Sequence, residues 1–275
     1  MSQSAPSLHY IGKCYDRYLI FCFYWLIDCL LIFHCFIFQW ARKTATPPRY
    51  EACNVDLKQS DPQPNSWLLS DQIAVSEANK IDITVRYFIR SCSKISNSGG
   101  GHYCVNVFDL FVHQSDQFIA DGGLYPDPLS NSVAYKRISK INQTTDKVTS
   151  ETISVLVKEK YVILAFHDYG ACSTLFSVKV TYNVCPDETL SNSLMSLLWT
   201  VAPANDSQPV RVKGNCDKDT VQVSGSLYVH CESNGEWNTT GLKGRCICKE
   251  DMQNNKGICE GNVVALTIIS LKMYK

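Results

Sequence analysis

Ten cysteines that follow residue 50 carry the clearest chemical signal in this sequence, because their spacing permits either disulfide bonds or metal ligation. They are Cys53, Cys92, Cys104, Cys172, Cys185, Cys216, Cys231, Cys246, Cys248 and Cys259. The Cys-x-Cys pair at 246–248 has no second closely spaced cysteine or histidine pair, so tetrahedral zinc ligation has little support. An even number of cysteines in a strand-rich sequence instead predicts a disulfide framework in an oxidising compartment, with no metal and no cofactor.

Three Asn-x-Ser/Thr triplets agree with export, because N-linked glycans are added to such triplets in the secretory pathway. They begin at Asn142, Asn205 and Asn238, and none has proline in the middle position. Together with the cysteines, these triplets predict a glycoprotein located at the plasma membrane or outside the cell.

A second set of residue types hints at catalysis, because His167 and Asp168 lie close to Ser173. Closeness in sequence does not fix the geometry of a triad, and no nucleophile elbow is present, so we interpret these residues as polar loop residues. The sequence also contains no Gly-rich loop, H-R-D or D-F-G motif of a kinase, and it therefore predicts no enzyme. The 26 basic and 26 acidic residues cancel, which argues against a nucleic-acid partner.

The elements that position the cysteines are short strands. Between Cys172 and Cys185, an apolar row alternates with polar residues and predicts a half-buried strand. That row is Phe176, Val178, Val180, Tyr182 and Val184. Further strands are expected at 50–55, 67–69, 73–75, 81–89, 105–112, 133–138, 153–157 and 161–166, separated by turn residues. This pattern favours an antiparallel β-sandwich or barrel.

Two details of this strand pattern remain open to test. Asp109 interrupts the strand at 105–112, and we expect it to face solvent or a bridging water. After Pro186 the composition changes, and residues 191–201 are expected to form a short helix or an irregular connection. A small module with closely spaced cysteines follows, which needs covalent links because its core is small. The C-terminal tail has about nine apolar residues, too few to span a membrane.

The N-terminal segment from Tyr18 to Trp40 is apolar over 23 residues, long enough to cross a bilayer as a helix. Its aromatic ends suit the membrane interfaces, and it is longer than the apolar part of a cleavable signal, so it predicts a signal-anchor. The positive-inside rule places the cysteine-rich part in the cytosol, whereas the cysteines and triplets favour the exterior, which we adopt. A mispredicted exon is the other interpretation of this segment.

Four blocks in order resemble the ligand-binding domain of Eph receptors, the tyrosine-kinase receptors for ephrins. They are YEACNV at 50–55, NSWL at 65–68, IDITVRYFIRSCS at 81–93 and AFHDYGACSTLFSVKVTYNVCP at 165–186. Residues 216–248 resemble the Sushi-like module that follows this domain, and CICKEDMQNNKGICEG resembles the start of an EGF-like module. The resemblance implies an antiparallel jelly-roll β-sandwich followed by a small disulfide-rich module.

Domain limits follow from these blocks. We expect an N-terminal apolar segment and linker at 1–46, the jelly roll at 47–186, the Sushi-like module at 187–247 and the EGF-like start with the tail at 248–275. The family's first strands should precede Tyr50, and the segment from Tyr18 to Trp40 stands in their place. A sandwich that lacks these strands is expected to expose an edge.

The resemblance also implies disulfides, a partner and a site. It implies the pairs Cys53–Cys172 and Cys92–Cys104, and in the style of Sushi and EGF modules the pairs Cys185–Cys231, Cys216–Cys246 and Cys248–Cys259. The partner is a membrane-bound ephrin-like protein, whose long loop enters a channel at one end of the sandwich. Arg90 is expected to contact an acidic residue of that loop, since a guanidinium donates two parallel hydrogen bonds to a carboxylate. The resemblance also implies that Cys92, Cys104, His167, Asp168 and Cys172 are ligand-binding residues, and that the Cys53–Cys172 and Cys92–Cys104 loops form the walls of the channel.

A different class of function remains open at this level. Jelly rolls also host lectins, so a secreted or anchored glycan-binding or adhesion module is the alternative. Exposed aromatic side chains beside carboxylates, or an Asp-rich calcium loop, would favour glycan binding, and the sequence contains no such calcium loop.

Overall fold

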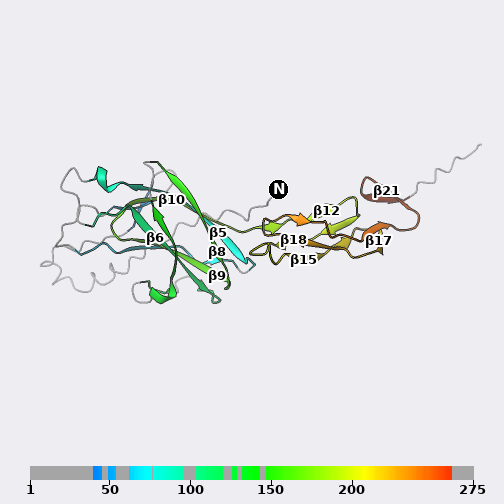
Figure 1. Cartoon of the computed structure of the whole chain (residues 1–275), viewed down its shortest axis with the longest axis horizontal. Coiled ribbons are helices and arrows are strands. Elements are labelled where there is room, and N and C mark those ends of the chain that lie inside the picture. The colour runs from blue at the N-terminus through cyan, green and yellow to red at the C-terminus, as the bar shows by residue number, and fades with distance from the viewer. Residues whose placement is uncertain are drawn as a thin grey trace, which may run out of the picture. The chain divides into compact units, whose positions relative to one another are not determined.

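A computed structural model describes residues 40–44, 49–53, 62–75, 77–95, 103–119, 126–128, 132–142 and 147–261 (Figure 1). The chain divides into two compact units, with the boundary between Tyr182 and Asn183. Within the described ranges, both units are built from antiparallel strands and contain no α-helix, and the first unit also has two short 3₁₀ turns. The expectation of a mostly β protein is confirmed.

The first unit is a β-sandwich of two antiparallel sheets. The first sheet has the order β1 (Ala41–Lys43), β2 (Arg49–Cys53), β10 (Cys172–Thr181), β5 (Lys80–Arg90) and β8 (Thr149–Leu156). The second sheet has the order β3 (Ser66–Leu69), β9 (Tyr161–Asp168), β6 (Val107–Ser115) and β7 (Lys136–Asn142), and β4 (Ile73–Ala74) also pairs with β9. Turns of 3₁₀ helix lie at Cys92–Lys94 (η1) and Ser132–Ala134 (η3). The chain crosses repeatedly between the two sheets, as expected for a jelly roll.

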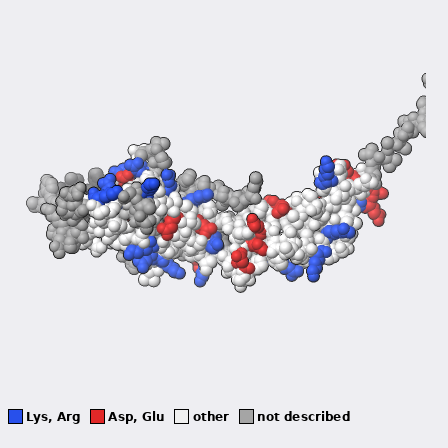
Figure 2. Space-filling model, turned by 45° about the horizontal axis from the view of Figure 1, so that its top comes forward, with Lys and Arg blue, Asp and Glu red and all other residues white. Residues whose placement is uncertain are grey.

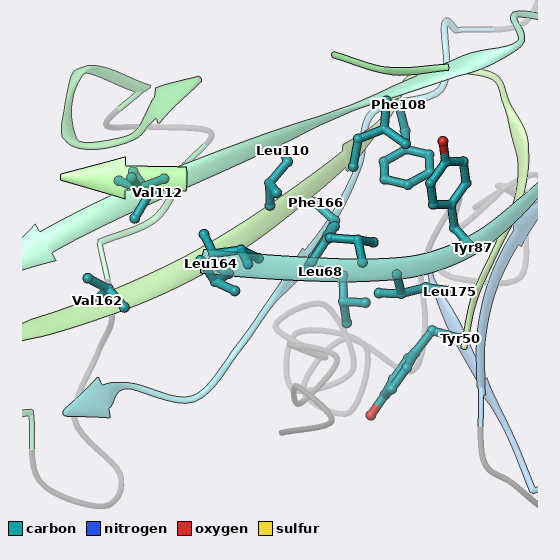
Figure 3. Packing of buried hydrophobic residues seen from close by; sticks show 14 of the residues in the cluster. Tyr50, Leu68, Tyr87, Phe108, Leu110, Val112, Val162, Leu164, Phe166 and Leu175 are labelled. Carbon is teal, nitrogen blue, oxygen red and sulfur yellow. The ribbon is translucent and has the colours of Figure 1, made fainter. Parts of the chain in front are cut away.

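The core between the two sheets follows the predicted period of two. In β5, Ile81, Ile83, Val85, Tyr87 and Ile89 are buried, whereas Arg86 and Arg90 are exposed. The second sheet contributes Phe108, Leu110, Val162, Leu164 and Phe166 to the same cluster (Figure 3). The rings of Tyr87 and Phe108 meet edge to face, with centroids 5.7 Å apart. Each such side chain stabilises the sandwich by roughly 1.5–3 kcal/mol through burial, which makes this core the main source of its stability.

Trp40 belongs to this core, which corrects the expectation that it ends a membrane span. Its side chain is 2% exposed, and its ring meets Phe108 edge to face at 6.1 Å. The following strand, β1, pairs with β2 directly before Tyr50, so the sandwich begins ahead of residue 47. The rest of the apolar segment, 18–39, lies outside the described residues, and no helix within the described ranges has the length and hydrophobicity to cross a bilayer.

The long strand β10 contains a β-bulge that the alternation did not predict. The pairing with β5 shifts between Leu175 and Ser177, and the bulge reverses which side chains face the core. Leu175 is in the core before the bulge, and Val178 packs against the core after it. Phe176 was predicted to be in the apolar row, and this is wrong: its ring lies under the guanidinium of Arg86 on the outer face, at 5.6 Å.

The second unit consists of small sheets linked by disulfides. Its strands are β11 (Val184–Cys185), β12 (Glu188–Leu190), β13 (Met195–Leu197), β14 (Thr200–Val201), β15 (Val210–Lys213), β16 (Asn215–Cys216), β17 (Thr220–Ser224), β18 (Tyr228–Cys231), β19 (Trp237–Asn238), β20 (Arg245–Cys248), β21 (Met252–Asn255) and β22 (Ile258–Gly261). Residues 191–201 contain a turn followed by β13 and β14, so of the two alternatives expected there, a short helix or an irregular connection, the helix is wrong. Its small core centres on Met195, Leu197 and Val229.

Five disulfides brace the two units within the described ranges, and they are the five pairs that the family resemblance implied. The first unit contains Cys53–Cys172 and Cys92–Cys104. The second unit contains Cys185–Cys231, Cys216–Cys246 and Cys248–Cys259. The first bridge closes a loop with a sequence separation of 119 residues. Longer loops lose more chain entropy on closure, so this bridge is expected to stabilise the sandwich most.

Candidate functional site

Arg90 ends β5 at one edge of the outer face of the first sheet. Cys172 on β10 lies opposite both Arg90 and Cys53, so these three residues form one row across three strands. The disulfide between Cys53 and Cys172 therefore ties the two strands beside Arg90. Arg90 is exposed, because the alternation that buries Ile89 turns its neighbour outward. An exposed guanidinium on a covalently braced row is suited to binding a carboxylate.

The Cys92–Cys104 loop begins directly beside Arg90. The turn η1 starts at Cys92, and the backbone N–H of Cys92 donates to the side-chain oxygen of Asn106 at 2.8 Å. The disulfide closes a loop with a sequence separation of 12 residues, of which 96–102 lie outside the described residues. Two cysteines that were predicted to wall the site thus lie next to Arg90.

The β9–β10 turn is held by the carboxylate of Asp168, which is fully buried. Its Oδ1 accepts from the backbone N–H of Gly170 and Ala171, and its Oδ2 accepts from the hydroxyl of Ser173 at 2.9 Å. Burial raises the pKa of Asp168 to about 6, and these three hydrogen bonds oppose the shift. Asp168, predicted among the ligand-binding residues, is closed off from a ligand by its own turn, so we assign it a positioning role.

Gly170 joins this turn to the Cys92–Cys104 loop. The backbone N–H of Val105, the residue after Cys104, donates to the carbonyl oxygen of Gly170 at 3.2 Å. Gly170 has φ of +131°, and a Cβ there would lie 2.1 Å from the carbonyl oxygen of Tyr103. Only glycine allows both this backbone conformation and this close approach. The turn and the loop are therefore held against each other next to the row that contains Cys172.

His167 lies on the opposite side of the sandwich from Arg90. It is on the outer face of the second sheet, where its ring stacks on Trp67 with centroids 4.1 Å apart. Its Nε2 bonds to the side-chain oxygen of Asn65 at 2.8 Å, so Nε2 carries the proton. Burial lowers the pKa of His167, and the carboxylate of Asp109 partly offsets this shift. The structure thus brings His167 neither to the Arg90 row nor to the Ser173 hydroxyl, and no triad forms.

Asp109 is buried, which corrects the expectation that it faces solvent. It lies directly opposite His167 in the sheet and is 6% exposed. Its Oδ2 accepts from the guanidinium of Arg137 at 3.2 Å, while its Oδ1 has no hydrogen-bond partner among the described residues. Asp109 lies on the outer face of the second sheet, but the aromatic side chains of that face cover it.

The register of the first sheet places three further residues beside Arg90 that sequence reasoning missed. Two residues further from the rim, Glu51, Thr174 and Phe88 form a second row across β2, β10 and β5. Strand spacings make the two rows a surface about 10 Å wide and 7 Å deep. Glu51 forms a 2.6 Å ion pair with Arg49, so this surface carries both signs of charge. Phe88 could be deduced from the sequence, because it lies two residues before Arg90 on the same face of β5. Glu51 and Thr174 lie on other strands, so their positions required the strand pairing.

The three Asn-x-Ser/Thr triplets all have an exposed or half-exposed asparagine. Asn205 accepts from the backbone N–H and the hydroxyl of Ser207, and Asn238 accepts likewise from Thr240. Asn142 ends β7 on the surface.

Positive and negative side chains are interspersed on the face shown in Figure 2. Within the described ranges, no group of three or more His, Cys, Asp or Glu side chains could hold a metal ion.

A disulfide-braced antiparallel sandwich with its candidate site on an exposed sheet face defines a ligand-binding module of the extracellular type. Comparison with known families makes this specific. Residues 38–185 match the ephrin receptor ligand binding domain, and residues 188–248 match the ephrin cysteine rich domain. The chain belongs to the ephrin receptor family. Neither of these two matched ranges is a kinase domain.

Proteins that are similar in sequence to this chain are ephrin receptors as well. The chain is 27% identical over 224 residues to ephrin type-B receptor 2 of Gallus gallus, covering 77% of this chain and 21% of that receptor. It is 28% identical over 222 residues to ephrin type-A receptor 5 of Rattus norvegicus and of Homo sapiens, covering 77% of this chain and 20% of each receptor. The chain thus spans about a fifth of the length of these relatives. The matched domains are extracellular parts of a receptor, which indicates a location outside the cell or at the plasma membrane.

Proposed function

We propose that this chain binds an ephrin through the outer face of the first sheet, at the row of Arg90, Cys172 and Cys53. The observation that carries the proposal is the pairing register, which places an exposed arginine beside a disulfide that joins two neighbouring strands. A rigid face lowers the entropy lost on binding, and a charged group at its edge selects an acidic partner. The membership of the chain in the ephrin receptor family supports ephrin as the partner.

Within this proposal the predicted site residues have distinct roles. Arg90 contacts an acidic residue of the ligand, and Glu51, Thr174 and Phe88 form the adjoining surface. The Cys92–Cys104 loop forms a wall of the site. Asp168 and Gly170 position that wall through the contact between the β9–β10 turn and residues 103–105. His167 takes no part, because it lies on the other sheet.

A titration with soluble ephrin ectodomains of both classes tests this function. Wild-type chain should bind with saturation, and Arg90→Glu should weaken binding by about 2 kcal/mol, or about 30-fold in Kd, as expected for reversing a charge at a hot spot. Lys179→Glu is the matched control: Lys179 is also exposed on the first sheet, but it lies seven residues beyond Cys172 on β10. That is roughly 20 Å away, beyond the screening length of about 8 Å at physiological salt.

The control shows whether a loss of affinity comes from the Arg90 site itself or from the general change in charge. We expect Lys179→Glu to bind within about threefold of wild type, because its charge is screened from the site. Equal losses in the two variants would contradict a localised Arg90 site. Absence of binding by the wild-type chain to either ephrin class would refute the function itself.

We further propose that Asn142, Asn205 and Asn238 carry N-linked glycans and that residues 18–39 serve for export or anchoring. The exposure of the three asparagines and the five disulfides support passage through the secretory pathway. Enzymatic deglycosylation of protein recovered from mammalian cells should lower its mass by the mass of three glycans. Asn→Gln variants assign each glycan to its site, and an unchanged mass would contradict glycosylation.

A further inference from the structure

A row of cations crosses the outer face of the first sheet, about 14 Å along β5 from Arg90. Lys43 on β1 lies directly opposite Arg49 on β2, so their side chains are on the same face. That face is the outer one, because Tyr50, the residue after Arg49, is buried in the core. Arg86 on β5 is exposed between two buried neighbours and therefore points outward as well. Three strand spacings separate Lys43 from Arg86, or about 14 Å.

The β-bulge of β10 places an aromatic ring inside this row. Leu175 pairs on both sides with the residues that follow Arg49 and Arg86, so Phe176 comes between the two arginines. The guanidinium of Arg86 lies over the ring of Phe176, at 5.6 Å from its centroid. This cation–π contact holds the guanidinium in place, so less rotamer entropy is lost when it binds an anion. Its planar fork can then donate two parallel hydrogen bonds to one anionic group.

The row and its neighbour on β10 have few acidic partners. Lys179 is exposed in the next row of the same face. Among the described residues, these two rows contain four cations and no carboxylate. On one side Glu51 pairs with Arg49, and on the other side Asp82 accepts a hydrogen bond from Ser154. Within the described part of the chain, the other three cations form no ion pair. A chain with zero net charge thus has a concentrated positive surface.

A ligand with several negative charges fits this surface better than a single anion, because the cations extend over about 14 Å across the strands and about 7 Å along them. Clusters of Lys and Arg bind heparin-type glycans or nucleic acids through such fields. The matched domains are extracellular parts of a receptor, and anionic lipids belong mainly to the cytoplasmic leaflet. Outside the cell, a sulfated polysaccharide supplies the required charge.

We propose that the surface formed by Lys43, Arg49, Arg86 and Lys179 binds a sulfated polysaccharide of the heparin class. The cations contact successive sulfate groups, and Phe176 positions Arg86 for one of them. This binding does not depend on the ephrin function proposed above, because Arg90 is not part of the surface.

Titration of the full chain with a heparin oligosaccharide tests the proposal. Wild-type chain should bind, and Kd should rise at least about tenfold between about 0.1 and 0.4 M salt, because binding a polyanion releases counterions. Arg86→Glu combined with Lys179→Glu should weaken binding at least about tenfold, and the corresponding Gln pair should show a smaller loss. The control is Lys213→Glu combined with Arg245→Glu, which makes the same change of charge at exposed residues of the second unit. It should stay within about threefold of wild type.

Lys179→Glu alone separates this site from the ephrin site. It should weaken heparin binding by about fivefold and leave ephrin affinity within about threefold of wild type, so either site can fail without the other. Unchanged urea midpoints should show that the variants are folded.

Four results would overturn the proposal. The first is absence of heparin binding by the wild-type chain, and the second is equal binding of the unsulfated backbone of heparin. The third is an equal loss in the control pair, which would show an effect of general charge. The fourth is binding to vesicles that contain phosphatidylserine but not to heparin, which would identify a membrane surface as the partner.

Discussion

Replacing Gly170 with alanine tests how the β9–β10 turn supports the proposed site. The new Cβ would lie 2.1 Å from the carbonyl oxygen of Tyr103, closer than any real contact, and the φ of +131° disfavours any side chain. Strain from such a conformation costs about 1–3 kcal/mol. Moving the turn away from Tyr103 also breaks the hydrogen bond from Val105, worth about 1 kcal/mol. The expected loss of stability is therefore about 2–4 kcal/mol.

Urea unfolding monitored by tryptophan fluorescence measures this loss. Trp40 lies in the core of the sandwich, so its environment reports unfolding of the first unit. With a slope of about 2 kcal/mol per molar urea, the midpoint of Gly170→Ala should fall by about 1–2 M. The matched control is Gly241→Ala, because no atom lies within 4 Å of a Cβ built there and its φ is ordinary.

The control should remain within about 0.5 kcal/mol of wild type, as is usual for surface substitutions. Ephrin affinity should fall in Gly170→Ala even where the protein remains folded, because the turn contacts the wall formed by the Cys92–Cys104 loop. A midpoint for Gly170→Ala within 0.2 M of wild type would refute the close packing of the turn on Tyr103, and with it the positioning role of this turn.

Three further predictions concern the sandwich. Burial raises the pKa of Asp168 from 3.8 to about 6, so the ionised carboxylate destabilises the fold. The free energy of unfolding should therefore rise by up to about 3 kcal/mol as pH falls from 7.5 to 4. Asp168→Asn should remove this part of the pH dependence, and an unaltered slope of stability against pH would contradict the prediction. Replacing the Cys53–Cys172 pair by serines should lower the free energy of unfolding by about 5 kcal/mol, against about 3 kcal/mol for Cys92–Cys104, because the separations are 119 and 12 residues. Equal losses of stability in calorimetry would contradict this loop-entropy explanation. Trp40→Ala should destabilise the sandwich by about 3–5 kcal/mol in urea unfolding, whereas a loss below 1 kcal/mol would remove Trp40 from the core.

Much of the fold could be predicted from local patterns. The alternation in residues 81–89 gave β5 and its buried face, because a period of two leaves only one orientation for a half-buried strand. It misplaced Phe176, since a β-bulge inserts one residue and the sequence has no marker such as glycine at that point. It also missed the strands in 191–201, where short apolar runs have no clear period.

The segment before residue 50 shows why burial cannot be deduced from hydrophobicity alone. Trp40 follows a long apolar run, and at a membrane interface or in a protein core the same side chain is equally suitable. Only the three-dimensional contact with Phe108 distinguishes the two environments.

The candidate site could be predicted in part. Arg90 and its neighbouring cysteines followed from the resemblance and from the end of a predicted strand. His167 and Asp168 are adjacent in sequence, yet one faces outward from the second sheet and the other is buried in a turn, because successive residues of a strand point to opposite faces. Glu51, Thr174 and Phe88 come from three different strands, and their proximity follows only from the pairing register.

Mapping the footprint of a bound ephrin ectodomain by hydrogen–deuterium exchange tests the central claim most directly. The account predicts slower exchange, on binding, for residues 49–53, 86–95 and 172–176, which form the outer face of the first sheet around Arg90, with no change in the second sheet near His167 or in residues 210–248. Protection confined to the second sheet or to the cysteine-rich unit would contradict the account.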